Sequence, residues 1–268
     1  MANRFRITSA SWLALLVLCI TSGRASAEGF TTAQVGWDTN CWYSGNDTDG
    51  DGLNQSCEQA LANWFAPTVW FDNGEDTDGW WPHFAVKSVD YASKTVSIAY
   101  LHSFYKDGGE LFGAGKHDGD SEFVIIEAHL SGSTWVADWV YMSAHRKATC
   151  DASQWYHYSQ ILWDGNYRGW ASVFASENKH ANYASDSQCD NACGGLENCD
   201  YDYWKTPTSD RNIGQSWGQL ISVEQGGSAY EWYWDVNKGF CGWQRAGYSA
   251  DHGGCAGSYY NHMQDFGY

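Results

Sequence analysis

The stretch EFVIIEAHLSGSTWVADWVYMSAH, residues 122–145, contains the clearest strand signals of the chain. Aromatic residues at Trp135, Trp139 and Tyr141 alternate with other residues at positions 136, 138 and 140, and this period of two is typical of a β-strand. Both faces of the alternation are largely apolar. We therefore expect a sandwich strand, with one face packed on the core and the other covered by loops.

Short segments rich in β-branched and aromatic residues recur on both sides of this stretch. They predict strands at residues 68–71, 84–91, 95–105, 122–130, 135–145, 171–175, 219–223 and 230–235. Only residues 58–65 (EQALANWF) have a clear helical pattern. Long loops rich in Gly and Asp fill residues 105–121 and 184–216. The sequence predicts an all-β fold, a jelly-roll-like β-sandwich with one short helix and long disulfide-tied loops.

Residues 1–27 have the order of features that is typical of a secretory signal peptide. Arg4 and Arg6 precede an apolar run at residues 13–20 (LALLVLCI), and a small-residue cleavage pattern follows at residues 25–27. The run is too short to cross a bilayer, and no later segment is long and apolar enough. We expect a secreted protein without a transmembrane segment. Residues 28–268 are expected to form a single β-rich domain, and the protein is expected to be a monomer.

The chain is strongly acidic, with 32 Asp and Glu against 15 Lys and Arg and a formal net charge of -17. This charge repels phosphate backbones and therefore excludes a general nucleic-acid binder. Aromatic residues make up 17% of the chain, which is too many for a disordered acidic protein. Asn46 and Asn54 begin N-glycosylation sequons, which matter only in a glycosylating host.

Eight cysteines follow the predicted signal peptide, and an even number in an exported chain predicts disulfides. They are Cys41, Cys57, Cys150, Cys189, Cys193, Cys199, Cys241 and Cys255. Closeness in sequence favours Cys41–Cys57 and Cys241–Cys255, with the other four connecting residue 150 to the 189–199 loop. The alternative for Cys189, Cys193 and Cys199 is a zinc site.

Residues 47–58 (DTDGDGLNQSCE) match the calcium-loop pattern D-x-[DN]-x-[DN]-G-x5-E. Gly52 takes the position of the sharp turn, and a helical pattern follows the loop. The predicted ligands are Asp47, Asp49, Asp51, the Leu53 carbonyl and Glu58. We predict a bound Ca²⁺ that fixes the N-terminal segment; the alternative is an acidic turn without an ion.

A second group of acids surrounds the loop after residues 95–105. A strand from about residue 120 places Asp120 and Glu122 on one face, where two carboxylates repel unless a cation or proton lies between them. Asp107 approaches the same point from the preceding strand, and His117 joins directly or through water. These ligands suit a hard divalent ion, Mg²⁺, Ca²⁺ or Mn²⁺. The alternative is a solvated acidic loop.

Residues 97–130 (SIAYLHSFYKDGGELFGAGKHDGDSEFVIIEAHL) resemble the core of the necrosis- and ethylene-inducing peptide-like proteins, secreted β-sandwich cytolysins of plant-associated microbes. In that family a tyrosine-rich strand ends in Lys-Asp, and a G-H-R-H-D-W-E motif follows. The resemblance implies that Asp107, Asp120 and Glu122 bind a divalent metal and that His117 is a motif histidine. It also implies a membrane-facing pole that binds sphingolipid head groups.

Two further segments resemble the vacuolar protein sorting-associated protein 62 family, whose members share F-A-P-x-x-x-F, G-D-x-E and K-H-x-x-Y motifs. The segments are residues 62–72 (ANWFAPTVWFD) and 177–183 (ENKHANY). This resemblance implies the same metal-bearing sandwich and adds His145 and His180 to the site.

These features predict a secreted, divalent-metal-dependent protein that recognises a polar lipid head group or glycan at a cell surface, with cytolysis as the implied outcome. The rival prediction is a secreted metal-dependent hydrolase of phosphate or glycosidic bonds, with His145 or His180 as acid or base. A third is a calcium-stabilised structural surface protein. The sequence leaves open whether the protein is an enzyme.

Overall fold

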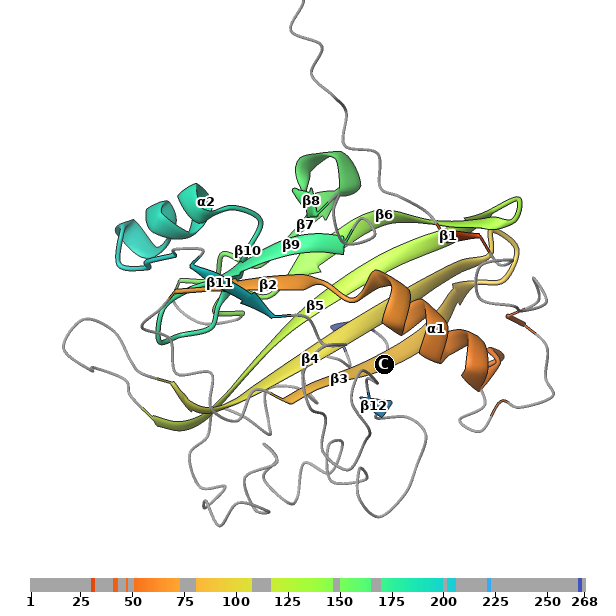
Figure 1. Ribbon diagram of the computed structural model, residues 1–268, viewed down its shortest axis with the longest axis horizontal. Helices are drawn as coiled ribbons and strands as arrows, with labels where there is room; N and C mark the ends of the chain where they lie inside the picture. Colours follow the sequence, from red (N-terminus) through yellow and green to blue (C-terminus); the bar gives the residue numbers. More distant parts are fainter. Residues whose placement is uncertain are drawn as a thin grey trace, which may run out of the picture.

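The computed structural model forms two β-sheets that share one apolar core, which confirms the predicted all-β sandwich (Figure 1). The structure describes residues 30–31, 41–42, 47, 51–72, 81–107, 117–146, 150–164, 170–199, 202–205, 221–222 and 265–266. Residues 1–27, the predicted signal peptide, lie outside this part of the chain.

The larger sheet has the strand order β1-β6-β5-β4-β3-β12, and β7 pairs with β6. Its strands are β1 (Phe30–Thr31), β3 (Trp81–Asp90), β4 (Thr95–Asp107), β5 (His117–Ser131), β6 (Thr134–Met142), β7 (Gln154–His157) and β12 (Ile221–Ser222). All pairs are antiparallel except β12 with β3. Consecutive strands β3 to β6 form a meander, which the short connections 91–94 and 132–133 favour.

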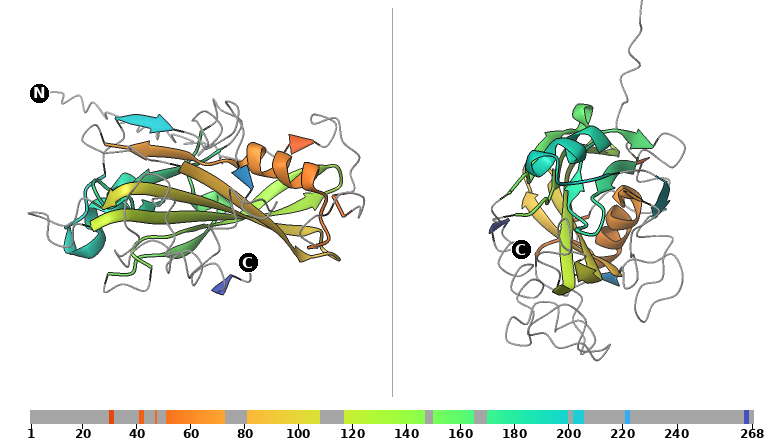
Figure 2. Two further views of the ribbon diagram at one scale, coloured as in Figure 1. Left: turned by 90° about the horizontal axis from the view of Figure 1, so that it is seen from below. Right: turned by 90° about the vertical axis from the view of Figure 1, so that its left-hand side faces the viewer.

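The smaller sheet has the order β10-β9-β2-β11, and β8 pairs with β9. Its strands are β2 (Thr68–Phe71), β8 (Trp163–Asp164), β9 (Trp170–Ala175), β10 (Asn182–Tyr183) and β11 (Tyr203–Lys205). Strands β2 and β9 are parallel, and the other pairs are antiparallel. Helix α1 (Gln55–Phe65) and β2 lie on the same side of the long strands (Figure 2, left).

Helix α1 begins before the predicted residue 58, because the Asn54 side chain caps it by accepting a hydrogen bond from the Ser56 N–H. A second short helix, α2 (Asp186–Asn191), was not predicted. Its Ser185 cap accepts from the Gln188 N–H, and Cys189 anchors it in a disulfide. Two 3-10 turns, Tyr158–Gln160 and Ala192–Gly194, complete the described helical elements.

The core lies between the sheets and beneath α1. Fully buried Tyr100 of β4 donates its hydroxyl hydrogen to the Ala62 carbonyl of α1 over 2.7 Å. At the other end of the sheet, buried Trp135 stacks on Trp42 with ring centroids 5.7 Å apart. These contacts connect the N-terminal segment to the meander by apolar burial and by one buried hydrogen bond.

The predicted strands at 68–71, 84–91, 95–105, 122–130, 135–145 and 171–175 all correspond to observed strands. Strand β5 begins at His117, because backbone pairing with β4 continues to Asp107↔His117. Only Ile221–Ser222 of the predicted 219–223 strand is described, and residues 230–235 lie outside the described part. Among described residues, no helix has the length and apolar character needed to cross a membrane.

Three disulfides are described: Cys41–Cys57, Cys150–Cys193 and Cys189–Cys199. They confirm the first predicted pair and the predicted connection of residue 150 to the 189–199 loop. The alternative zinc site at Cys189, Cys193 and Cys199 is wrong, because all three sulfurs are in disulfides. Cys241 and Cys255 lie outside the described residues.

Replacing Tyr100 by Phe should lower the free energy of unfolding by about 1–2 kcal/mol, because the buried Ala62 carbonyl loses its hydroxyl donor. Urea unfolding at neutral pH measures this change. Tyr91→Phe is the matched control, since Tyr91 is 70% exposed and should change stability by less than about 0.5 kcal/mol. Equal stability of the two variants would contradict the proposed role of the hydroxyl.

Candidate functional site

The predicted metal ligands Asp107, His117, Asp120 and Glu122 all lie at one end of the β4–β5 pair. Asp107 pairs with His117, and two further pairs along the ladder are Phe104↔Asp120 and His102↔Glu122. The pairing of β3 with β4 ends at Ser103 and that of β6 with β5 ends at Val124. Beyond those points β4 and β5 pair only with each other among the described strands, and Figure 1 shows their olive ends extending past the sheet.

The side chains of Asp107, His117 and Asp120 lie outside the described part of the structure, so the register locates only their backbone. Glu122 is described and is 7% exposed. Its carboxylate oxygen Oε2 accepts a hydrogen bond from the Ser143 hydroxyl. The structure thus brings one of the four predicted ligands into a defined, buried position at the point where the two-stranded extension begins.

Ser143, the residue after β6, holds Glu122 through a set of backbone contacts. The Phe123 N–H donates to Ser143 Oγ over 2.8 Å, and the Ser143 N–H donates to the Phe123 carbonyl over 3.0 Å. The Asn182 N–H of β10 donates to the Ser143 carbonyl over 2.7 Å. Both sheets therefore contribute to the position of this serine and, through it, of the Glu122 carboxylate.

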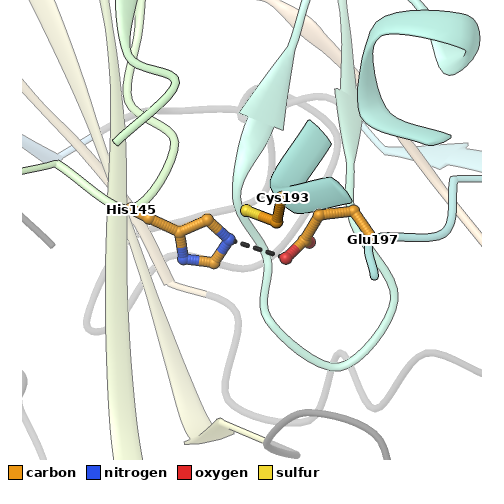
Figure 3. A group of neighbouring side chains, drawn as sticks. All are labelled: His145, Cys193 and Glu197. Atoms are coloured by element: carbon orange, nitrogen blue, oxygen red, sulfur yellow. Dashed lines mark hydrogen bonds and ion pairs between the residues drawn. The ribbon is translucent and has the colours of Figure 1, made fainter. Parts of the chain in front are cut away.

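His145, a predicted site residue, forms a pair with Glu197 that the sequence did not predict. Its Nε2 lies 2.8 Å from Glu197 Oε1, and the two side chains are 16% and 3% exposed (Figure 3). Burial pushes the pKa of Glu197 upward, but the hydrogen bond and charge of His145, with smaller help from Ser176 and Lys179, hold it below its ordinary value. The Glu197 carboxylate is therefore ionised at neutral pH.

Cys193 lies beside this pair. Its Sγ, a ring nitrogen of His145 and a Glu197 oxygen all lie within 4.8 Å of one another, which is a spacing that a metal ion could span. Cys193 is bonded to Cys150, so it presents a disulfide sulfur and not the thiolate that metal ions bind. The described residues thus contain a triad with the spacing of metal ligands, in which the sulfur is held in a disulfide.

Tyr183 is 2% exposed and is close enough to the two buried glutamates for their charges to act on its hydroxyl. Burial, followed by the charges of Glu197 and Glu122, raises the pKa of its hydroxyl far above the usual range. The phenol is therefore neutral at all physiological pH values and keeps its hydrogen as a donor.

His180, the other predicted histidine, is 1% exposed and lies flat against Phe104 of β4. The two ring centroids are 3.6 Å apart with an interplanar angle of 8°. The His180 N–H donates to the Ser176 carbonyl over 2.9 Å. His180 therefore packs the smaller sheet against the strand that leads to Asp107.

Backbone strain concentrates in the same region. The described non-glycine residues with positive φ are Lys94, His145, Asn178, His180 and Cys193. Lys94 is in the β3–β4 turn, whereas the other four belong to the segments around the His145–Glu197 pair. Such conformations cost about 1–3 kcal/mol each and persist where surrounding contacts fix them, which is common at functional sites.

The predicted calcium loop has local geometry that fits its pattern. Gly52 has φ +91°, which suits the turn position that glycine occupies, and its N–H donates to Asp47 Oδ2 over 3.0 Å. Asp51 Oδ2 accepts from the Ser88 N–H of β3 over 3.1 Å. Burial, and to a smaller extent the Asp47 charge, raises the pKa of Asp51 despite backbone hydrogen bonds.

Two further features lie at the ends of this loop. Glu58, the predicted closing ligand, is fully buried in the first turn of α1. The Cys41–Cys57 disulfide and the hydrogen bond from the Asn54 N–H to the Cys41 carbonyl connect the chain before the loop to the helix after it. Leu53, whose carbonyl is the predicted fifth ligand, is itself buried, and Asp49 lies outside the described residues.

Sequence reasoning missed Glu197 and Tyr183. Glu197 lies in an irregular loop without periodicity, and Tyr183 lies in a strand of two residues. The usable signal was the predicted connection of residue 150 to the 189–199 loop, because a disulfide between them places the acid of that loop near the end of the preceding strand. The pairing of residue 150 with residue 193 then indicates which strand end the loop reaches.

Comparisons with solved structures show similarity to necrosis and ethylene-inducing proteins. NLPPya in complex with glucosamine has 16% identity and a TM-score of 0.38, over 64% of this chain and 76% of that chain. NLPPya in complex with mannosamine has 14% identity and a TM-score of 0.36 over the same shares. Necrosis and Ethylene inducing Protein 2 from the causal agent of cocoa's Witches Broom disease has 15% identity and a TM-score of 0.35, over 63% and 75%. No family model and no curated protein matches the chain.

His145→Ala should lower the free energy of unfolding at pH 7 by about 1.5–3 kcal/mol, because the buried, ionised carboxylate of Glu197 loses this hydrogen-bond partner. In the native protein the lowered pKa of Glu197 stabilises the fold at pH values above its ordinary pKa of 4.5. This stabilisation is lost as the pH falls through the folded-state pKa. The variant should therefore be less sensitive to acid in that window.

Urea unfolding from roughly pH 3 to pH 7 tests this expectation. The matched control is His129→Ala, which removes the His129–Asp138 pair, whose side chains are 36% and 32% exposed, and should change stability by about 0–1 kcal/mol. If both variants lost the same stability at every pH, the His145–Glu197 pair would have no special role.

Proposed function

We propose that the chain is a secreted recognition protein that binds a glycan or a polar lipid head group through a divalent cation at the β4–β5 end. The observation that carries this proposal is the β4–β5 register, which places all four residues on one two-stranded extension: Asp120 and Glu122 share a face, and the Asp107–His117 pair lies three residues beyond Asp120 on the opposite face. Three carboxylates and one imidazole form a donor set typical of Mg²⁺, Ca²⁺ or Mn²⁺ sites.

The fixed carboxylate of Glu122 supports this proposal. Ser143 and the backbone of two sheets hold it, so little side-chain entropy is lost when it binds a ligand. Asp120, two residues away on the same face, would share the ion, whereas Asp107 and His117 lie further along the extension. A bound cation supplies open coordination positions, which adjacent hydroxyl oxygens of a sugar or head group can occupy.

The acidic character of the chain gives the cation a second role. A head group that carries an anionic phosphate or sulfate approaches without repulsion only if the local carboxylate charge is offset. A divalent ion at Glu122 would offset two charges at the point of contact. Cation binding would then be a precondition of ligand binding and not a separate event.

We also propose that residues 47–58 bind a structural Ca²⁺. The turn at Gly52, the acceptor geometry of Asp47 and the burial of Glu58 support this assignment, with Asp49, Asp51 and the Leu53 carbonyl as the other ligands. Because Asp51 also contacts β3, the ion would fix the loop, α1 and the larger sheet together. Secretion is consistent with both ions and with three described disulfides.

The Asp120→Asn/Glu122→Gln double variant should lose cation-dependent binding of glucosamine, mannosamine or vesicles that contain a glycosylated sphingolipid. Titration calorimetry with and without Mn²⁺ and vesicle co-sedimentation measure the loss, which we expect to exceed about tenfold in affinity. Asp202→Asn is the control, since Asp202 is exposed and precedes β11.

Two results would contradict the proposal. Unchanged binding in the double variant would exclude this end as the site. Chelator-sensitive turnover of generic phosphodiester or glycoside substrates, lost in the same variant, would instead establish the rival metal-dependent hydrolase.

Asp47→Ala should abolish the stabilisation that calcium gives the native protein. At a free calcium concentration of about 100 times the dissociation constant, that stabilisation should reach about 2.7 kcal/mol. Melting temperatures in calcium and in chelator measure it, and Asp202→Asn should retain the full effect. A native melting temperature that does not respond to calcium would refute the structural ion.

A further inference from the structure

We propose that the Cys150–Cys193 disulfide masks a zinc site, and that release of Cys193 lets its thiolate bind Zn²⁺ together with His145 and Glu197. The inference is independent of the cation proposed at Glu122. It assigns a soft transition-metal site to the triad in Figure 3, whereas the β4–β5 end has ligands for a hard ion.

The geometry of the triad carries the proposal. The three ligand atoms already lie within 4.8 Å of one another, and His145 Nε2 and Glu197 Oε1 are 2.8 Å apart. Zinc binds thiolate, imidazole and carboxylate at about 2.0–2.3 Å in a tetrahedron, so side-chain adjustments of about 1 Å bring all three atoms onto one ion. Three protein ligands leave the fourth position for water or an external ligand.

The scaffold of the triad does not depend on the Cys150–Cys193 bond alone. Next to His145, the Ala144 N–H donates to Ser153 Oγ over 2.8 Å, and the Ala152 N–H donates to the Ala144 carbonyl over 2.9 Å. Next to Glu197, the Glu177 N–H donates to the Asn198 carbonyl over 2.8 Å. These contacts keep two of the ligands in position when the disulfide opens.

The separate Cys189–Cys199 disulfide closes the loop on both sides of Cys193. It therefore limits how far the released thiol can move from His145 and Glu197. A ligand that stays near its partners after release binds the ion with a smaller loss of chain entropy.

The exposure of its two cysteines should make Cys150–Cys193 the first of the described disulfides to be reduced. Cys150 and Cys193 are both partly exposed, whereas Cys41, Cys57, Cys189 and Cys199 are all at most 6% exposed. Thiol–disulfide exchange needs access of the attacking thiolate to a sulfur atom. Of the three described disulfides, Cys150–Cys193 is thus the one that a dissolved thiol reaches without unfolding.

The chemistry balances with a dithiol as the reductant. The dithiol transfers two electrons and two protons to the Cys150–Cys193 bond, which becomes two thiols while the reductant becomes a cyclic disulfide. Zinc binding then displaces the proton of the Cys193 thiol into solvent. The site would therefore form in a reducing compartment and be absent in an oxidising one.

The Cys150→Ser variant tests the proposal without any reductant, because it leaves Cys193 as a free thiol. With Co²⁺ as a spectroscopic substitute for zinc, the variant should show a thiolate-to-cobalt charge-transfer band and tetrahedral ligand-field bands. The oxidised native protein and the Cys150→Ser/Cys193→Ser variant should show neither. Adding His145→Ala to Cys150→Ser should weaken Co²⁺ and Zn²⁺ binding by about 10–100-fold or more.

Native protein treated with a dithiol is the second measurement, and it remains decisive if Cys150→Ser fails to fold. Mass mapping after alkylation should show Cys189–Cys199 intact, and circular dichroism should show retained β-structure. Absence of the cobalt–thiolate band in both the folded variant and the reduced native protein would overturn the proposal. Persistence of the band in Cys150→Ser/Cys193→Ser would do so as well, because another cysteine would then be the ligand.

Discussion

The antiparallel pairing of β4 with β5 is the interaction on which the rest of the structure depends. It runs in unbroken register from Thr95↔His129 to Asp107↔His117. Because side chains alternate along a strand, a slip of one residue would move the buried residues of both strands to the opposite face. The same register fixes Val124 in the core and the position of Glu122 next to it, so the core and the candidate site are specified together.

The surroundings of the β4–β5 ladder change where the flanking strands β3 and β6 end. Over the middle, β3 and β6 flank it and α1 covers it, so apolar burial stabilises the pair. Past Ser103 and Val124 the flanking strands stop, and the buried carboxylate of Glu122 lies beside the buried rings of Phe104 and Phe123. Glu122 is tolerated there because Ser143 satisfies its carboxylate, as buried polar groups require. A rigid sheet thus presents a carboxylate at its open end with little freedom to move.

Most of the fold could be predicted from the sequence because its strong signals are local. The alternation around Trp135 and Tyr141 predicted the strand that became β6, and closeness in sequence predicted Cys41–Cys57. The pair of His145 with Glu197 could not be predicted, since it joins residues 52 positions apart and depends on the path of an irregular loop. The start of β5 at His117 was missed for a related reason: pairing with β4, not the propensity of a Gly- and Asp-rich segment, makes it a strand.

Disulfides, more than apolar packing, hold the loop that carries Glu197. The loop that carries Glu197 is rich in Gly and Asn and buries few large side chains, so packing alone would hold it weakly. Cys189–Cys199 and Cys150–Cys193 attach it to itself and to the segment after β6, and this fixes Glu197 against His145. The positive φ values of His145 and Cys193 are compatible with such a framework, because cross-links and the buried pair offset the strain. The Cys150–Cys193 disulfide helps to position Glu197 and at the same time occupies the sulfur of Cys193. The redox state of this one bond would therefore decide which ligands this end of the molecule offers.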